Sequence, residues 1–454
     1  MSFKEINEKL LREFAPNIER FTRKDWFWSL LMAAVILVGF YALYLQIVEG
    51  HSITGMRDHV VWGLYIANFI FFIGISYAGA IISGILHLLK MEWRKPIIRI
   101  AELITVIATI IGPLYILLCI GRLDRLHYLF IYPRLQSPIT WDVIAIITYL
   151  IGSLIFLYLA LIRDFSILGN ESLKVSSGRK KIYKFLSLGF KNSPKQKRLL
   201  KASTNIMALI IIPIAIVVHS VLSWIFGMTL RPGWHSTIFG PYFVLAAIYS
   251  GTGVMIMAMY VFRRMYNLQE YITRKHFVYL GYILIILGAG YGYFTFSEYL
   301  TDWYSSEKWN SELIEKLFNW EEYGGLFFFA NVAGILLPII VIGIPKLQSI
   351  GSITAVSALM VLAMWVKRYL IVVPTLETTL LPMQETRPEY LEYSATWVEW
   401  ALTFAGVAAF ILMFKLASKF IPIVPIWETS ESISRKSKAL GNHQGVDKKS
   451  IAHA

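Results

Sequence analysis

Long apolar runs constrain this chain more than any other feature of its sequence. A transmembrane helix needs about 20 mostly apolar residues, and such runs recur along the sequence, separated by short connectors rich in turn-forming residues. Only 16% of the residues are charged, whereas a globular domain carries about 25%. The sequence therefore predicts an all-α polytopic membrane protein. Its ten predicted transmembrane helices lie at 26–48, 60–88, 97–121, 139–163, 203–226, 238–262, 276–297, 324–344, 350–370 and 394–416.

Lysine and arginine are distributed unevenly between the two sets of connectors. Of the 43 such residues, 33 lie in the tails and connectors on the side of both termini, and 10, Arg387 among them, lie on the other side. Cytoplasmic connectors carry the basic excess in membrane proteins. We therefore expect a multi-pass protein of the cytoplasmic (inner) membrane with both termini cytoplasmic. The formal net charge of +14 then reflects this asymmetry and attraction to anionic lipid headgroups, and nucleic-acid binding is not needed to explain it.

The cytoplasmic tails and connectors are predicted to be largely irregular. Residues 1–25 form an N-terminal segment that is too interrupted by charges to be a signal peptide. Its apolar residues recur at helical spacing, so it is either a short helix on the membrane surface or a disordered lead-in. The connector 163–201 is expected to be a solvated or lipid-contacting loop, and 417–454 a cytoplasmic tail.

The outer connector 298–323 is acidic, with seven aspartate and glutamate residues. Its segment 311–320 has the pattern of a small amphipathic helix. Such a segment is either a docking surface for an extracytoplasmic partner or a free surface helix.

A redox metal bound by this chain is not expected. The single cysteine, Cys119, cannot form a disulfide within the chain or supply the four thiolates of an iron–sulfur cluster. Haem b also fits poorly, because His87 and His219 lie near opposite ends of their predicted helices. Any haem or iron–sulfur cluster is therefore expected in a partner.

Six polar residues on six predicted helices lie at a similar depth. In the predicted orientation each lies within about 12 Å of the outer face, at a rise of about 1.5 Å per residue. They are Asn68, Arg122, Asp142, His219, Arg368 and Glu399. Ionisable groups inside a bilayer are costly and tend to mark binding sites or ion pathways, so this convergence indicates a site.

Each of these residues also has a purely structural explanation. Asp142 could interact with the positive end of its helix, and the two arginines could reach lipid phosphates. Asn68 and His219 could link neighbouring helices. Glu399 could be an interfacial anchor, and His235 a simple loop residue.

A quinone headgroup requires the kind of chemistry that these residues offer. It needs hydrogen-bonding groups at its two carbonyl oxygens and, when the quinol is oxidised, a proton acceptor; a carboxylate near an arginine and a histidine can act so. A transporter site is expected near the midplane with broken helices, whereas these spans are mostly apolar and unbroken there. Nearer the cytoplasmic face, Glu102 and Asp164 are candidates for a proton path, although Asp164 could instead form a helix-end pair with Arg163.

Several motifs together resemble the NrfD/PsrC family of membrane subunits. The motifs include "NFIFFIGISYAGAIISGIL", "GRLDR…RLQSPITWDV", "VHSVLSWIFG", "PGWHSTIFGPYF", "KRYLIVVP" and "ATWVEW", and the resemblance covers most of residues 26–427. The ten-helix members look closest, namely ActC of alternative complex III and DsrP (HmeB) of the DsrMKJOP complex. Cys119 and Tyr77 stand where ActC-like members carry histidines, and the "GRLDR…RLQSPITWD" wording is more similar to DsrP.

The resemblance implies both an architecture and a set of partners. It implies two four-helix bundles, 60–226 and 238–370, flanked by helices 26–48 and 394–416. It also implies a menaquinone site in the first bundle, facing an extracytoplasmic ferredoxin-like iron–sulfur subunit. A multihaem cytochrome c and further membrane subunits are expected as additional partners.

These observations lead to one functional hypothesis and two alternatives. The chain is predicted to be a quinone-interacting membrane subunit of a multisubunit respiratory oxidoreductase, in which Asp142 with His127 or His219 handles protons and Arg122 orients Asp142. The predicted quinone-binding residues are Asn68, Tyr77, Arg122, Asp142, His219, His235, Arg368 and Glu399. The alternatives are a membrane anchor or proton-translocating subunit without quinone chemistry, and a secondary transporter.

Overall fold

The computed structural model describes residues 3–169, 175–378 and 392–434, so Arg387 and residues 435–454 of the predicted tail lie outside it. All regular secondary structure in the described residues is helical. Nine helical segments there are long and apolar enough to cross a membrane. They are α2 (Arg23–Glu49), α4 (Ile98–Cys119), α6 (Pro138–Leu168), α8 (Pro194–Gly227), α9 (Phe239–Met265), α10 (Arg274–Ser305), α12 to α13 (Gly324–Gly343), α14 (Ile350–Glu377) and α15 (Trp397–Phe420). The predicted all-α polytopic fold is confirmed.

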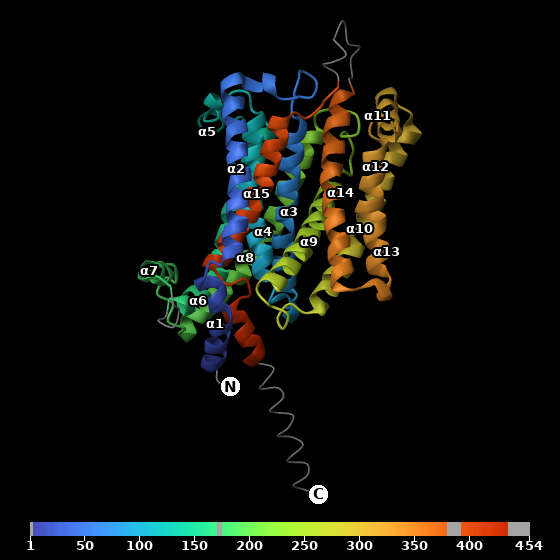
Figure 1. Ribbon diagram of the computed structural model, residues 1–454. Helices are drawn as coiled ribbons and strands as arrows, with labels where there is room; N and C mark the ends of the chain where they lie inside the picture. Colours follow the sequence, from blue (N-terminus) through green and yellow to red (C-terminus); the bar gives the residue numbers. More distant parts are fainter. Residues whose placement is uncertain (1–2, 170–174, 379–391, 435–454) are drawn as a thin grey trace.

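The helix α3 (Gly63–Leu88) runs through the middle of this assembly (Figure 1). Its first part, Gly63–Tyr77, is apolar and almost wholly buried by its neighbours. The prediction of exactly ten spans therefore stays a prediction, with α3 as the tenth element concerned.

The two ends of the molecule carry different short helices (Figure 1). The helices α1 (Phe3–Glu19) and α7 (Ser177–Leu186) lie at one end, and α5 (Tyr128–Ile131) and α11 (Lys308–Phe318) lie at the other. We call these the α1/α7 end and the α5/α11 end. The long helices run between these two ends in alternating directions. The connectors at the α1/α7 end therefore form the set rich in lysine and arginine, and those at the α5/α11 end form the other set.

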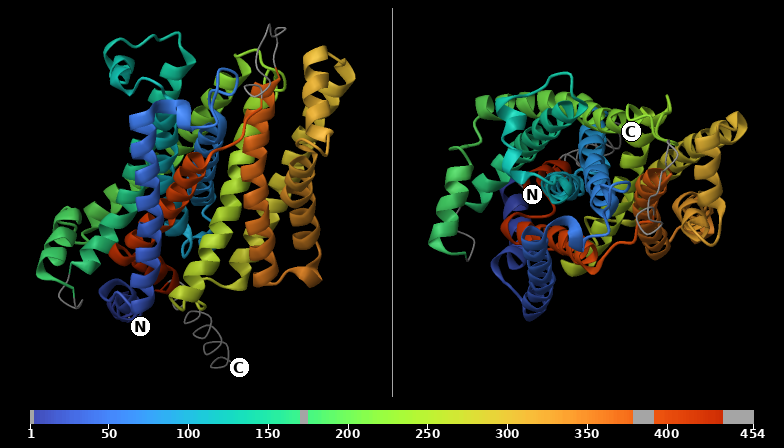
Figure 2. Two further views of the ribbon diagram at one scale, coloured as in Figure 1. Left: turned by 45° about the horizontal axis from the view of Figure 1, so that its top comes forward. Right: turned by 90° about the horizontal axis from the view of Figure 1, so that it is seen from above.

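The long helices pack in two groups that share a boundary at α3 (Figure 2). In the first helix group α3 packs against α4 and α8, and α6 packs against both α4 and α8. The second helix group consists of α9, α10, α12 to α13 and α14, and α3 contacts its α9 and α14. α15 packs against α4, and α2 packs on α15. That each group is a separate unit, as the limits 60–226 and 238–370 imply, stays a prediction.

Small residues allow the first helix group to pack closely. A Cβ atom at Gly79 of α3 would lie 1.8 Å from the Thr105 hydroxyl oxygen and 2.1 Å from the Ala101 carbonyl oxygen of α4. Without a strong hydrophobic driving force between helices in lipid, such close backbone approach is what holds membrane helices together. Gly79 is therefore a packing requirement of the α3–α4 contact.

The described residues of the connector 163–201 are mostly helical, so the prediction of a loop was wrong. α6 continues to Leu168, α7 lies between, and α8 begins at Pro194 instead of 203. α8 starts there because Ser193 and Gln196 form a capping box around Pro194 in the first helical position. Ser176 caps α7 by accepting a hydrogen bond from the backbone N–H of Arg179.

The two predicted short amphipathic helices are both present. In α1 the apolar stripe of Ile6, Leu10 and Phe14 is buried against the protein, and α1 packs on the end of α15. In α11 Leu313 and Leu317 are buried, and the helix packs against α10, α12 and α14. Both helices therefore cover the ends of the transmembrane helices.

One of the spans contains a turn of a different helix type. Between α12 (Gly324–Asn331) and α13 (Leu337–Gly343), residues Val332–Leu336 form a π-helical turn. Such turns are rare and occur frequently at functional sites. The span predicted at 324–344 is present as Gly324–Gly343, with this π-helical turn in its middle.

Candidate functional site

Asp142 is buried near the start of α6, inside the first helix group. It is 5% exposed, and its Oδ1 has no hydrogen-bond partner among the described residues. Pro138 begins α6 one turn earlier, where its missing N–H costs nothing. Leaving a buried polar group unpaired costs roughly 1–3 kcal/mol, so Asp142 is held at an energetic disadvantage that binding of a ligand or proton would relieve.

His219 of α8 and Tyr77 of α3 contact each other inside the same helix group. Their ring centroids lie 4.4 Å apart and their planes meet at 70°. His219 is 1% exposed and Tyr77 is fully buried. Within the described residues neither ring nitrogen of His219 nor the Tyr77 hydroxyl makes a hydrogen bond. The pair thus presents several unused donors and acceptors within the transmembrane interior.

Arg368 of α14 brings a positive charge to the boundary between the two helix groups. It is 2% exposed, and its guanidinium carbon lies 5.5 Å from the centroid of the Phe243 ring. The guanidinium lies beside Gly74 of α3, since a Cβ atom built there would be 3.9 Å from Nη2, an ordinary van der Waals contact. Gly74 and Tyr77 are three residues apart on α3, so the guanidinium lies on the same side of α3 as Tyr77. We call Tyr77, His219 and Arg368 the central cluster.

Asn68 of α3 links three helices. Its Nδ2 donates to the Thr403 hydroxyl of α15 at 2.7 Å, and its Oδ1 accepts from the indole N–H of Trp365 of α14 at 2.8 Å. These contacts match the helix-linking alternative for Asn68.

Glu399 of α15 caps a helix and joins two connectors. With Thr396 it forms a capping box, and its carboxylate also accepts from the backbone N–H of Gly55 at 2.7 Å and the Tyr393 hydroxyl at 2.5 Å. Since both carboxylate oxygens are occupied within the chain, the contacts match the anchoring alternative.

The expected partnership of Arg122 with Asp142 is absent. Arg122 lies in the exposed connector after α4 and binds Asp124 through two hydrogen bonds, of 2.9 and 2.7 Å. The two side chains are 63% and 60% exposed, and the Arg122 hydrogen bonds hold the pKa of Asp124 at about 2. Arg122 therefore binds the carboxylate of Asp124, two residues away, and not that of Asp142 as predicted.

Two predicted histidines are exposed at the α5/α11 end. His127 precedes α5 and packs its ring against Tyr128, with centroids 4.4 Å apart. His235 lies between α8 and α9, and its Nδ1 is 3.0 Å from the Gly227 carbonyl oxygen. Both lie outside the interior that holds Asp142 and the central cluster.

A row of polar groups continues from Asp142 along one face of α6. Tyr149 and Ser153 follow Asp142 at intervals of seven and four residues, which places all three on one helix face. The Tyr149 hydroxyl donates to the Ser76 carbonyl at 3.0 Å, and the Thr105 hydroxyl of α4 donates to the same carbonyl at 2.8 Å. These groups connect α6, α3 and α4 in the middle of the first helix group, and the sequence had not singled out Tyr149 or Thr105.

Buried acids occupy the α1/α7 end of the same helix group. Glu102 of α4 is 3% exposed, and neither carboxylate oxygen has a hydrogen-bond partner among the described residues. Asp164 of α6 accepts from Arg99 Nη2 at 3.0 Å and from the backbone N–H of Trp427 at 3.1 Å. The alternative pairing of Asp164 with Arg163 is thus wrong, since Arg163 stacks on Trp427 instead.

The second helix group contains a buried lysine that the sequence analysis missed. Lys367 of α14 is 3% exposed, donates to the Tyr299 hydroxyl and lies 4.5 Å from the centroid of the Tyr299 ring. Two successive cations, Lys367 and Arg368, in an otherwise apolar span were the signal that could have identified it.

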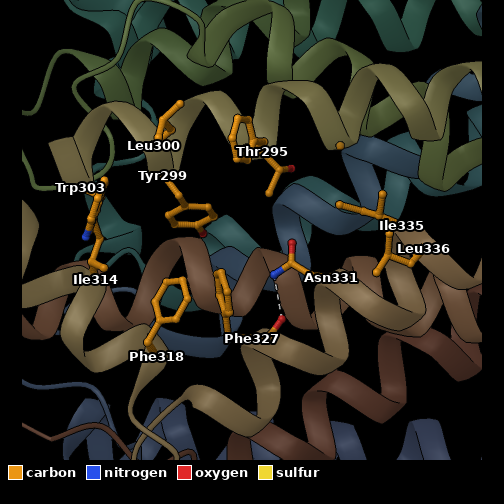
Figure 3. Close-up of a pocket in the computed structure, with 12 residues that line it drawn as sticks. Thr295, Tyr299, Leu300, Trp303, Ile314, Phe318, Phe327, Asn331, Ile335 and Leu336 are labelled. Carbon is orange, nitrogen blue, oxygen red and sulfur yellow. Dashed lines mark hydrogen bonds between the residues drawn. The ribbon is translucent and has the colours of Figure 1, made fainter.

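An apolar pocket of about 730 Å³ has Tyr299 in its lining (Figure 3). It is lined by α10, α11, α12 and the π-helical turn, with Phe318, Phe327 and Tyr299 projecting towards its interior. Asn331 donates to the Phe327 carbonyl at 2.8 Å. The mostly hydrocarbon lining of this pocket suits an acyl or isoprenoid chain better than a polar ring.

Together these features define a class of protein. The chain is a polytopic α-helical membrane protein whose interior carries buried ionisable groups, and such groups in membrane helices mark binding sites or proton routes.

The chain belongs to the NrfD family. The family described as polysulphide reductase, NrfD, matches residues 52–379. A putative membrane subunit of the dimethyl sulfoxide reductase of Halobacterium salinarum is 30% identical over 234 residues, which are 51% of this chain and 50% of that protein. The match therefore spans half the length of that relative.

Two further relatives match over most of their length. A subunit of the selenate reductase of Mesobacillus selenatarsenatis is 20% identical over 87% of this chain and 93% of its own. The Hdr-like menaquinol oxidoreductase integral membrane subunit of Archaeoglobus fulgidus is 23% identical over the same two shares. The finer assignment to DsrP or ActC stays a prediction.

Proposed function

We propose that this chain is the quinone-interacting membrane subunit of a multisubunit respiratory oxidoreductase, exchanging electrons between menaquinone and an extracytoplasmic iron–sulfur subunit. Membership of the NrfD family and a relative named as a menaquinol oxidoreductase subunit support the proposal. The observation that carries it is the set of buried, unpaired polar atoms on Asp142, His219 and Tyr77 inside the first helix group.

These residues fit a quinone by their chemistry. When bound, a quinol supplies two electrons and two protons on oxidation. The Tyr77 hydroxyl can donate to a ring carbonyl oxygen, and a neutral His219 can donate from one ring nitrogen and accept at the other. Arg368 favours any negative charge near the central cluster, and the ionised Asp142 can accept a proton.

Protons would leave or enter along the first helix group. Asp142, Tyr149 and Ser153 share one face of α6, and Tyr149 is joined through the Ser76 carbonyl to Thr105 of α4. Glu102 lies one turn further along α4. Because Glu102 has no hydrogen-bond partner in the described part of the chain, it can hold a proton there, with Asp164 nearer the cytoplasm.

The α5/α11 end would face the extracytoplasmic partner. The basic excess at the α1/α7 end favours a cytoplasmic location for that end, in the cytoplasmic membrane. Arg122, His127 and His235 are exposed at the opposite end, as are several acids of the 298–323 connector. We assign these residues to the rim and the docking surface, and Asn68 and Glu399 to holding the helices around the site.

Replacing Asp142 with Asn tests the proposal. The change is nearly isosteric but removes the proton acceptor, so menaquinol-dependent electron transfer in the assembled complex should fall by about 100-fold or more. The matched control is Asp58→Asn, which alters an exposed carboxylate in the α2–α3 connector and should leave turnover unchanged.

The outcome also separates the alternatives. Unchanged turnover in the Asp142→Asn complex would remove Asp142 from the mechanism. Extracts without quinone, together with turnover that quinone-site inhibitors do not affect, would favour an anchoring or proton-translocating subunit. Transport by the isolated chain, without an iron–sulfur partner, would favour a secondary transporter.

A further inference from the structure

A strongly basic cavity of about 800 Å³ lies at the α1/α7 end. It is formed by the end of α3 and the connector after it, by α6, by the start of α8 and by residues 425–431. Seven lysine and arginine side chains line it against four acidic ones. Two of those acids already have partners, since Glu92 pairs with Lys95 and Asp164 with Arg99. The remaining charge is therefore predominantly positive.

Arg94 is the best-placed cation for a ligand in this cavity. It is only 7% exposed, yet within the described residues its Nε and Nη1 have no hydrogen-bond acceptor. These two nitrogens carry three of the five N–H donors of a guanidinium. Buried charges are normally paired, so the unused donors call for an anionic acceptor.

A hydrogen-bonded histidine fixes the position of Arg94. Its Nη2 lies 2.8 Å from His87 Nδ1, and His87 Nε2 lies 2.7 Å from Asn205 Oδ1. Since arginine can only donate, Nδ1 accepts and Nε2 donates to Asn205. These hydrogen bonds orient the guanidinium, but no carboxylate of the described residues lies within ion-pair distance of it.

Two more cations of the cavity lining gather around Trp427. The Arg163 guanidinium carbon lies 5.1 Å from the centroid of the Trp427 ring, and Lys197 Nζ lies 5.6 Å from it. Nε of Arg163 is also buried without a hydrogen-bond partner among the described residues. Trp427 thus holds cations from α6 and α8 around the same space.

The cavity also has apolar walls. Leu88, Leu159 and Leu200 are part of its lining, and Leu88 is 40% exposed. A ligand that suits both surfaces carries a phosphate group and hydrocarbon chains. Basic pockets between membrane helices on the cytoplasmic side bind such lipid headgroups.

We propose that this cavity binds an anionic phospholipid, with its phosphate on Arg94 and Arg163 and its acyl chains along the leucines. The cavity shares Asp164 with the proposed proton route, but the lipid proposal does not depend on quinone chemistry. A free phosphate ion shares the charged part of this chemistry but would not use the apolar walls.

The test compares three ligands on the purified full chain in mild detergent, with its partner subunits where it is isolated as a complex. Dioleoylphosphatidylglycerol, dioleoylphosphatidylcholine and inorganic phosphate are titrated separately. The melting temperature is followed, and native mass spectrometry counts the lipids retained. The wild-type protein should retain phosphatidylglycerol and be stabilised by it, with little response to the other two.

Variants then locate the site. Arg94→Gln should need at least about tenfold more phosphatidylglycerol for the same stabilisation, because charge-assisted hydrogen bonds are lost. Arg163→Gln serves as an independent second variant with the same expected direction. Lys346→Gln, which removes an exposed cation at the same end outside the cavity, should behave as the wild type.

Three results would overturn the proposal. Equal retention of phosphatidylglycerol by Arg163→Gln and by any folded Arg94→Gln protein would place the lipid elsewhere. An equal response to phosphatidylcholine would remove the role of headgroup charge. Stabilisation by inorganic phosphate that matches that of phosphatidylglycerol would make the site a phosphate site and not a lipid site.

Discussion

Removing Arg99 should destabilise the protein strongly, because Asp164 would remain as a buried carboxylate. Nη2 of Arg99 lies 3.0 Å from Oδ2 of Asp164, and both side chains are 1% exposed. The single hydrogen bond from the Trp427 backbone cannot replace a guanidinium charge. Breaking a buried ion pair by removing one partner costs about 3–5 kcal/mol, so Arg99→Met should lower the free energy of unfolding by about that amount.

A double variant separates the charge from the packing. Replacing a buried ion pair with apolar residues of similar volume is often neutral, so Arg99→Met combined with Asp164→Leu should recover about 2 kcal/mol or more of the single-variant loss. Glu102 lies one turn after Arg99 on α4 and also interacts with its charge. The recovery will be incomplete if this second interaction also stabilises the fold.

The assay is unfolding in mixed micelles, with sodium dodecyl sulfate titrated into dodecyl maltoside and tryptophan fluorescence as the signal. Arg125→Met, which removes an exposed arginine of the connector between α4 and α6, is the control and should be nearly neutral. A cost below about 1 kcal/mol for Arg99→Met, or a double variant as unstable as the single one, would refute the reasoning.

Two further substitutions test the packing and capping assignments. Gly79→Val should prevent close α3–α4 packing, because even a Cβ atom would lie 1.8 Å from the Thr105 hydroxyl oxygen; the yield of folded protein in size-exclusion chromatography should collapse, and a normal yield would show that the contact is dispensable. Glu399→Ala should cost about 2–4 kcal/mol of stability by removing a cap and leaving buried donors unpaired, while turnover per folded complex stays unchanged. A loss of turnover without a loss of stability would instead make Glu399 part of the site.

The sequence predicts the transmembrane helices well because apolar length is a local property. The sequence places the ends of these helices poorly. A helix can continue beyond its apolar segment into charged residues, where hydropathy no longer marks it. α8 begins in the basic segment after Ser193, where the capping box with Gln196 was the readable signal. The π-helical turn before Pro338 has no comparably clear pattern in the sequence.

The candidate site was predictable in depth but not in direction. The spacing of residues along each helix indicates that Asp142 and His219 lie in the half nearer the α5/α11 end, but not which neighbour each one faces. The contact of His219 with Tyr77 depends on how α8 and α3 are rotated about their axes. Arg122 does not reach Asp142 because it binds the nearby Asp124. Glu399 was different, since Thr396 three residues earlier already has the capping-box pattern.

Photoaffinity labelling with an azido-substituted menaquinone locates the bound ring most directly. After illumination of the intact complex, peptide mapping identifies the labelled segment. We predict labelled peptides from α3 and α8 around Tyr77 and His219, and loss of that label in the presence of excess menaquinone. Label confined to the apolar pocket between α10 and α12, at Tyr299 and its neighbours, would contradict a quinone site in the first helix group.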